Sequence, residues 1–139
     1  MLSTNSIASD RHRHSCLSLV AERRKRLTRL APHLPEPERG MLLAIFADGL
    51  PVATVAAMRG EPTWRFRRRL ARLVRRVDSP EFALALAPWQ LPTDETAAVA
   101  RACFVHGLTV RAAALVLNVT LHTVIRERAR VQALARHAA

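Results

Sequence analysis

The residues with the clearest chemical potential are seven arginines between Arg65 and Arg76, a stretch of twelve residues without an acidic side chain. A guanidinium group donates paired hydrogen bonds to a phosphate or to the major-groove edge of guanine. Such a cluster therefore indicates a surface for nucleic acid. The whole chain favours the same class of partner, because its formal net charge is +11 and its pI is near 11.7.

The charge is unevenly distributed along the 139 residues. Residues 1–78 hold 16 basic and 7 acidic side chains, whereas residues 79–139 hold 6 and 4. Arginine outnumbers lysine 21 to 1, so a compositional preference for arginine and alanine could supply many of these charges without a function. That alternative accounts for the general background better than for the cluster at Arg65–Arg76.

The remaining side chains offer little chemistry. His12-x-His14-x-Cys16 and Cys103-x-x-His106 lack the paired clusters that a structural zinc site needs. We expect the second pair to be a buried thiol beside a histidine at a helix end. The sequence has no Ser/His/Asp order, glycine-rich phosphate loop or convergent carboxylate pair. We therefore expect no catalytic residue, metal, cofactor or small-molecule substrate.

The arginine cluster belongs to one of two segments that repeat each other 58 positions apart. Residues 46–73 and 104–131 align without a gap, and 8 of the 28 aligned positions are identical. Each copy has the pattern of a helix, a glycine turn, a short helix, a tight turn and a longer helix. This is the pattern of a helix-turn-helix unit, and internal repetition of this kind decides the architecture.

The residue types within each copy suit two closely packed helices. Ala56 and Ala114 lie midway along the short helices, where the longer helix must approach. Gly60 and Asn118 lie in the turns, and these two residue types adopt positive φ at the lowest cost. Both copies are therefore expected to hold their last helix against the short one.

The sequence predicts an all-α protein of about eight helices, with two tandem helix-turn-helix units, a basic N-terminal helix and no sheet. No segment alternates polar and apolar residues with a period of two. Ser79 is a predicted N-cap before Pro80, and Trp89 is expected to pack against the core. The predicted organisation is a disordered start at 1–15, a basic amphipathic helix at 16–33, a first unit at 34–78, a connector with a short helix at 79–92 and a second unit at 93–139.

Several cellular contexts are disfavoured. Two cysteines are too few for a disulfide framework and indicate a reducing compartment. The longest uncharged run, Ala112–Ile125, has 14 residues, which is too short to span a bilayer. No signal peptide is apparent near the start. We expect a cytoplasmic protein without a membrane partner, associated with the nucleoid if it binds DNA.

Residues Gly107–Val124, GLTVRAAALVLNVTLHTV, resemble the helix-turn-helix of bacterial sigma-factor region four and related regulators. The pattern of that family is approximately G-L-S-x-x-E-I-A-x-x-L-G-I-S-x-x-T-V. Residues 49–70 follow the same register but carry Arg59 and Glu61 where the family has apolar anchors. The two copies cover about half of the chain. The resemblance implies a bacterial transcriptional regulator that binds double-stranded DNA with a sequence preference.

A complete sigma factor is not expected. Such a factor also needs a domain that binds core polymerase and melts promoters through exposed aromatic side chains. Only 4% of this chain is aromatic, and the segment before the first repeat is too short to hold that domain. A small regulator with tandem units is the better interpretation.

The family register also implies which residues would contact DNA. In the first copy these are Thr63, Trp64, Arg65, Arg67, Arg68, Arg72, Arg75 and Arg76. In the second copy they are His122, Thr123, Arg126 and Arg130, whereas Leu121 and Ile125 would touch a thymine methyl or pack on a protein partner. Because arginine pairs with bases and phosphates better than aliphatic side chains do, we expect the first copy to be the main contact.

A hypothesis from a different class stays open at this stage. The Leu121/Ile125 face and the helix at Cys16–Leu30 could bind RNA polymerase or another regulator, so that the protein acts as an adaptor or anti-activator without reading DNA. A second copy of the chain is another candidate partner. Both recognition helices could also serve only to form the core.

Overall fold

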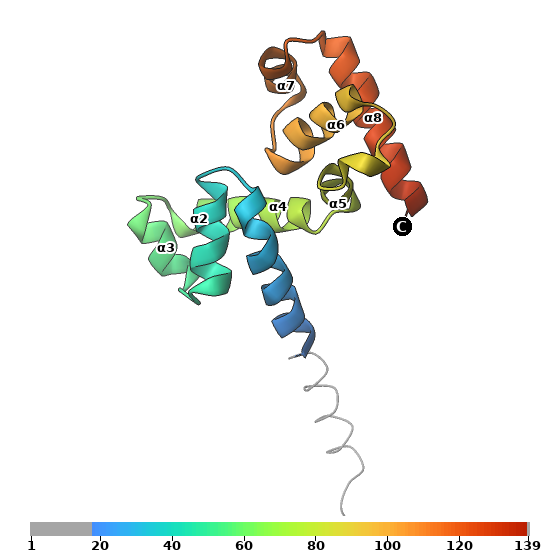
Figure 1. The fold of residues 1–139 in the computed structure, drawn as a ribbon. Coiled ribbons are helices and arrows are strands. Elements are labelled where there is room, and N and C mark those ends of the chain that lie inside the picture. Colours follow the sequence, from blue (N-terminus) through green and yellow to red (C-terminus); the bar gives the residue numbers. More distant parts are fainter. Residues whose placement is uncertain (1–17, 139) are drawn as a thin grey trace, which may run out of the picture.

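The computed structural model describes residues 18–138, and this part of the chain is helical without any strand (Figure 1). A first helix at residues 18–30 and the 3-10 turn η1 (Ala31–His33) precede the first unit, which contains α2 (Glu38–Leu42), η2 (Leu43–Ala47), α3 (Val52–Met58) and α4 (Thr63–Val77). The connector contains α5 (Pro80–Ala85) and the 3-10 turn η3 (Pro88–Gln90). The second unit contains α6 (Asp94–Ala100), η4 (Arg101–Val105), α7 (Val110–Leu117) and α8 (Leu121–Ala138). The predicted all-α class is confirmed.

None of the helices in this described range is long and apolar enough to cross a membrane.

The 58-residue offset of the sequence repeat also relates the helices. α3 and α7 begin at Val52 and Val110, and α4 and α8 begin at Thr63 and Leu121. The segments η2 and η4 obey the same offset, and both have π-helical geometry. Because π-helices account for well under 1% of residues in globular proteins, their recurrence at one position shows that the backbone itself is repeated.

The π segments differ from the ordinary α-helix that the apolar spacing predicts there. The backbone N–H of Asp48 donates to the carbonyl of Leu43, five residues back, at 2.9 Å. His106 and Arg101 form the equivalent bond at 3.0 Å. The first helix of each unit therefore widens into a π-helical turn just before Gly49 or Gly107.

Residues with positive φ form the turns of both units. Gly60 has φ of 65° and Asn118 has φ of 54°, and each joins a short helix to the longer one that follows. Glycine pays no steric penalty for this conformation and asparagine pays a small one. The tight turns predicted from these two residues are confirmed.

Hydroxyl groups begin the helices from α5 onward. The side chain of Ser79 accepts a hydrogen bond from the N–H of Phe82 at 3.2 Å, which confirms its predicted capping role. Thr93 and Thr109 cap α6 and α7 in the same way. These bonds satisfy backbone donors that have no partner within their helix.

One continuous apolar core joins the two units. α4 contributes Phe66, Leu70, Leu73, Val74 and Val77, and α8 contributes Val124, Val131 and Ala135. Phe82 on α5 is 1% exposed and packs within the same core. In Figure 1, α4 leads from the first unit towards α5, above which the second unit lies. The outer face of α4 is therefore fixed relative to both units.

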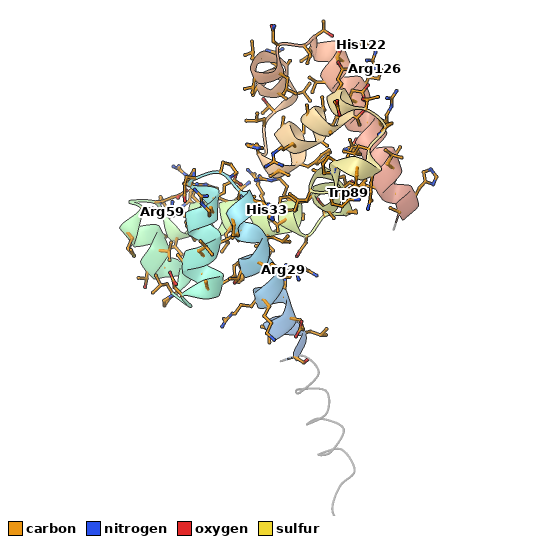
Figure 2. All side chains as sticks on the ribbon, viewed as in Figure 1. Arg29, His33, Arg59, Trp89, His122 and Arg126 are labelled. Carbon is orange, nitrogen blue, oxygen red and sulfur yellow. The ribbon has the colours of Figure 1, made fainter. Side chains whose placement is uncertain are left out.

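Two packing expectations need correction. Trp89 is 78% exposed on η3 instead of buried, because its neighbour Leu91 occupies the core position in this connector (Figure 2). Ala56 is completely buried under α4, whereas its counterpart Ala114 is only half-buried. On α7 the fully buried small residue is Ala113. The contact between short and long helices is therefore shifted slightly between the copies.

The packing of α3 against α4 generates a stability prediction. Ala56 is buried, and Ala57, the next residue on α3, is exposed. Ala56→Glu would bury a carboxylate without a partner, which should lower the free energy of unfolding by more than about 3 kcal/mol. The matched surface change Ala57→Glu should alter it by less than about 0.5 kcal/mol. Urea unfolding followed by circular dichroism measures both, and equal small losses would show that α3 is not seated on α4 as described.

Candidate nucleic-acid interface

The buried face of α4 determines where its arginines point. Its five core residues are at most 9% exposed and recur at the spacing of one helical stripe. The arginines between them must lie on the opposite side or at its margins. The exposed residues of this helix are Trp64, Arg65, Arg67, Arg68, Arg69, Ala71, Arg72 and Arg75.

Four of these residues form a single row along the outer face of α4. Trp64, Arg68, Arg72 and Arg75 are spaced at i, i+4, i+8 and i+11, which places them above one another on a helix. The guanidinium carbon of Arg65 lies 5.5 Å from the centroid of the Trp64 ring, a favourable cation–π distance. The Trp64 side chain is 59% exposed and leaves part of its ring open to a ligand.

Two arginines of α4 are used within the protein. Arg69 Nη1 forms an ion pair with Glu61 Oε2 at 2.6 Å. Arg76 Nη2 forms one with Glu38 Oε2 at 2.5 Å and also donates to the carbonyl of Val105 at 3.2 Å. Arg76 therefore departs from the exposed contact that the sequence predicts. It is half-buried and connects the first unit to η4 of the second.

The other five arginines of α4 have no ion-pair partner among the acidic residues of the described chain. They are Arg65, Arg67, Arg68, Arg72 and Arg75. Within residues 18–138 their positive charge is not neutralised by a carboxylate, which leaves it available to an anionic partner. This distinguishes α4 from the corresponding helix of the second unit.

Two arginines of α8, Arg126 and Arg130, are held by a buried carboxylate. Glu127 is 2% exposed and accepts a hydrogen bond from the Thr96 hydroxyl at 2.6 Å. Arg126 lies 3.3 Å from the same carboxylate and 3.6 Å from Glu95, and Arg130 lies 3.4 Å from Glu127. In the repeat, Arg126 and Arg130 correspond to Arg68 and Arg72, which have no such partners. The same residue types are therefore partly neutralised in the second copy.

The environment of Glu127 keeps it charged. The hydrogen bond from Thr96, together with Arg126 and Arg130, lowers the pKa of this carboxyl, although burial opposes the shift. The site that Glu127 occupies corresponds to Arg69 in the first unit. A reversal of charge at one repeated position thus changes which neighbouring arginines are free.

The other residues predicted at the start of α8 have mixed surroundings. His122 and Arg126 are exposed there (Figure 2). The Thr123 hydroxyl lies 2.8 Å from the hydroxyl of Thr120, whose oxygen also accepts the N–H of Thr123 and so caps the helix. The hydroxyl and the backbone N–H of Thr123 are therefore already engaged in hydrogen bonds with the capping Thr120. On α4, the predicted contact residue Thr63 is half-buried.

Apolar side chains are exposed at the end of α7 and the beginning of α8. Leu121 and Ile125 are 43% and 50% exposed, as required of residues that would contact a partner. Leu115 and Val116 on α7 are more exposed still, at 83% and 70%. We call these four residues the α7–α8 apolar surface. Sequence reasoning missed its α7 half, although the uncharged run from Ala112 leaves Arg111 as the only charged residue of that helix.

The described residues 18–138 contain no group of three or more His, Cys, Asp or Glu side chains that could hold a metal ion. Cys103 is buried, and burial raises the pKa of its thiol despite the nearby Arg128. His106 is exposed at the end of η4. The three residues His12, His14 and Cys16 lie outside the described range.

No protein-family model, curated protein or solved structure matches this chain. The arrangement of charge and apolar surface over α4, α7 and α8 is therefore the basis for a functional proposal.

The depressed pKa of Glu127 gives a pH prediction. A carboxyl whose pKa is lower in the folded state contributes stability above its unfolded pKa of about 4.3, and that contribution is lost as the pH falls through the folded pKa. Wild-type protein should therefore lose stability on acidification more steeply than Glu127→Gln. At neutral pH the variant should be the less stable of the two, because Arg126 and Arg130 lose their shared partner.

Urea unfolding at a series of pH values measures this difference. Glu95→Gln is the matched control, because Glu95 is about half exposed and pairs only with Arg126 among the described residues. Parallel stability curves for the wild type and Glu127→Gln would contradict the role given to this carboxylate.

Proposed function

We propose that this protein is a transcriptional regulator that binds double-stranded DNA with a sequence preference through the outer face of α4. The observation that carries the proposal is the set of five exposed arginines on α4 that lack an acidic partner in the described chain. The resemblance of both units to the helix-turn-helix of sigma-factor region four supports the same conclusion. In such units the second helix of the motif enters the major groove.

The chemistry of α4 suits both kinds of DNA contact. Arginines along a helix neutralise phosphates and thereby release counterions, which supplies affinity for any duplex. An arginine that reaches a guanine edge adds a sequence preference. The row of Trp64, Arg68, Arg72 and Arg75 offers both, and an exposed indole can pack on a sugar or an unstacked base.

In this proposal the second unit mainly supports the first. Its equivalent arginines, Arg126 and Arg130, are paired with Glu127. On the helices that flank the turn, the aliphatic side chains of Leu115, Val116, Leu121 and Ile125 are exposed. A surface of this kind is poor at reading base edges but good at packing.

A second candidate function is favoured by the α7–α8 apolar surface. Exposed aliphatic side chains at four positions on two adjoining helices are typical of a protein-binding surface. The protein would then be an adaptor or anti-activator that binds RNA polymerase or another regulator without reading DNA. Its binding would depend on Leu121 and Ile125 and not on α4.

The two repeats supply a charge-matched experiment. We expect Arg68→Gln with Arg72→Gln to weaken duplex binding, whereas the equivalent change of Arg126 and Arg130 should have a much smaller effect. Fluorescence anisotropy with a random-sequence duplex at several salt concentrations gives the affinity and its salt dependence. Five neutralised phosphates predict a slope of log affinity against log salt of about −4 to −5 for wild type, and the α4 variant should flatten it by about 2.

Each outcome assigns the function differently. Circular dichroism first establishes that both double variants are folded at the temperature of the assay, because the α8 changes also remove the partners of Glu127. A wild type that fails to bind duplex at low salt would overturn the DNA proposal and favour the adaptor. Loss of binding in the α8 variant alone would mean that the roles of the two units are reversed.

A further inference from the structure

A hollow lined by arginines lies where the two units meet. It has a volume of about 360 Å³ and opens between the end of α4, the start of α5, η4 and α8. We call it the junction groove. Its lining residues are Arg72, Arg75, Arg76, Ser79, Glu81, Cys103, Phe104 and Arg128. Four arginines, contributed by both units, and one carboxylate therefore line this small hollow.

Arg128 occupies a position that the repeat normally assigns to the core. Its counterpart in the first unit is Leu70, which is 9% exposed within the apolar cluster. Arg128 is half-buried instead, with its guanidinium carbon 5.6 Å from the centroid of the Phe104 ring. It forms no ion pair with an acidic residue of the described chain. A partly desolvated cation without a carboxylate is costly unless an anion approaches it.

Arg76 is a fixed part of the same wall. Its ion pair with Glu38 and its bond to the carbonyl of Val105 hold the guanidinium in place. The group packs so closely on Gly107 that a Cβ atom at this position would collide with it. The Nε of Arg76 is buried and has no hydrogen-bond partner among the described residues. The Arg76 side of the groove is therefore held in place by contacts within the protein.

Arg72 and Arg75 link the groove to the outer row of α4. Both line the groove, and both belong to the row that also contains Trp64 and Arg68. A strand of nucleic acid that follows this row would therefore bring a phosphate to the groove and within reach of Arg128. Paired guanidinium donors match the oxygens of a phosphate in charge and in geometry.

We propose that the junction groove binds a phosphate group of the duplex held on α4, so that Arg128 of the second unit contacts the DNA backbone. This inference rests on the proposed function for its source of phosphate. The site itself is defined by the chemistry of a phosphate oxyanion, which inorganic pyrophosphate shares. The second unit then contributes affinity through the groove although Arg126 and Arg130 on α8 are partly neutralised.

The test compares Arg128→Met with Arg136→Met in the full chain. Methionine retains an apolar stem where the first unit has Leu70, so the fold should be kept. Arg136 lies on the same helix, is exposed, and bonds only weakly to the carbonyl of Gln132. We expect Arg128→Met to flatten the salt slope of duplex binding by about 1 and Arg136→Met to leave it unchanged. If circular dichroism shows Arg128→Met to be unfolded, Arg128→Gln, which removes the charge and keeps a polar end, takes its place and must give the same flattening.

Pyrophosphate separates the groove from the proposed function. Its effect on the melting temperature is measured against chloride of equal ionic strength, for wild type and Arg128→Met. If Arg128→Met binds duplex with the same salt slope as wild type, the groove does not bind phosphate, and the proposed function still holds. A wild type that does not bind duplex overturns the proposed function; pyrophosphate must then stabilise wild type and not Arg128→Met, or the groove is overturned as well.

Discussion

Burial of the apolar face of α4 is the constraint on which the rest of this structure depends. Burying one large aliphatic or aromatic side chain contributes about 1.5–3 kcal/mol, so the five core residues of α4 together contribute on the order of 10 kcal/mol. That is comparable to the whole net stability of a small domain. The helix cannot rotate to bury its arginines without losing this contribution. The outward display of positive charge is thus a consequence of core packing.

The two units show how one backbone can carry two different surfaces. Their turns, their π segments and the starts of their last two helices agree at an offset of 58 residues. Yet exchanging Arg69 for Glu127 converts free arginines into paired ones, and exchanging Leu70 for Arg128 places a cation at the junction. Neither exchange alters the path of the helices. The two copies therefore share a backbone but differ in surface chemistry, and at Leu70 and Arg128 they differ at a core position as well.

The sequence predicted the features that local chemistry determines. The turns at Gly60 and Asn118 follow from the backbone freedom of these residues, and the cap at Ser79 follows from its hydroxyl and the proline after it. The apolar stripe of α4 follows from helical spacing. All of these depend on residues within a few positions of one another, which is why no tertiary information was needed.

The features that the sequence did not predict depend on distant partners. Arg76 bonds to Glu38 and Val105, which are 38 and 29 residues away in the sequence. Helical spacing alone could therefore not predict that Arg76 is bound within the protein while its neighbour Arg75 is exposed. Trp89 is exposed because Leu91 occupies the core position of this connector, and which of the two is buried depends on the packing of the surrounding helices. The junction groove requires Arg128 to approach α4 from the other unit. The alignment does contain a hint of it, since a charged residue stands opposite Leu70.

The claim that α4 and not α8 presents the main nucleic-acid surface is tested most directly by nuclear magnetic resonance. The backbone amides and the arginine Nε–H groups of ¹⁵N-labelled protein report contact residue by residue during titration with a duplex at low salt. We predict that shifts concentrate on Trp64, Arg68, Arg72 and Arg75, while His122 and Arg126 at the start of α8 change little. Shifts centred on the start of α8, with the signals of α4 unmoved, would contradict the account.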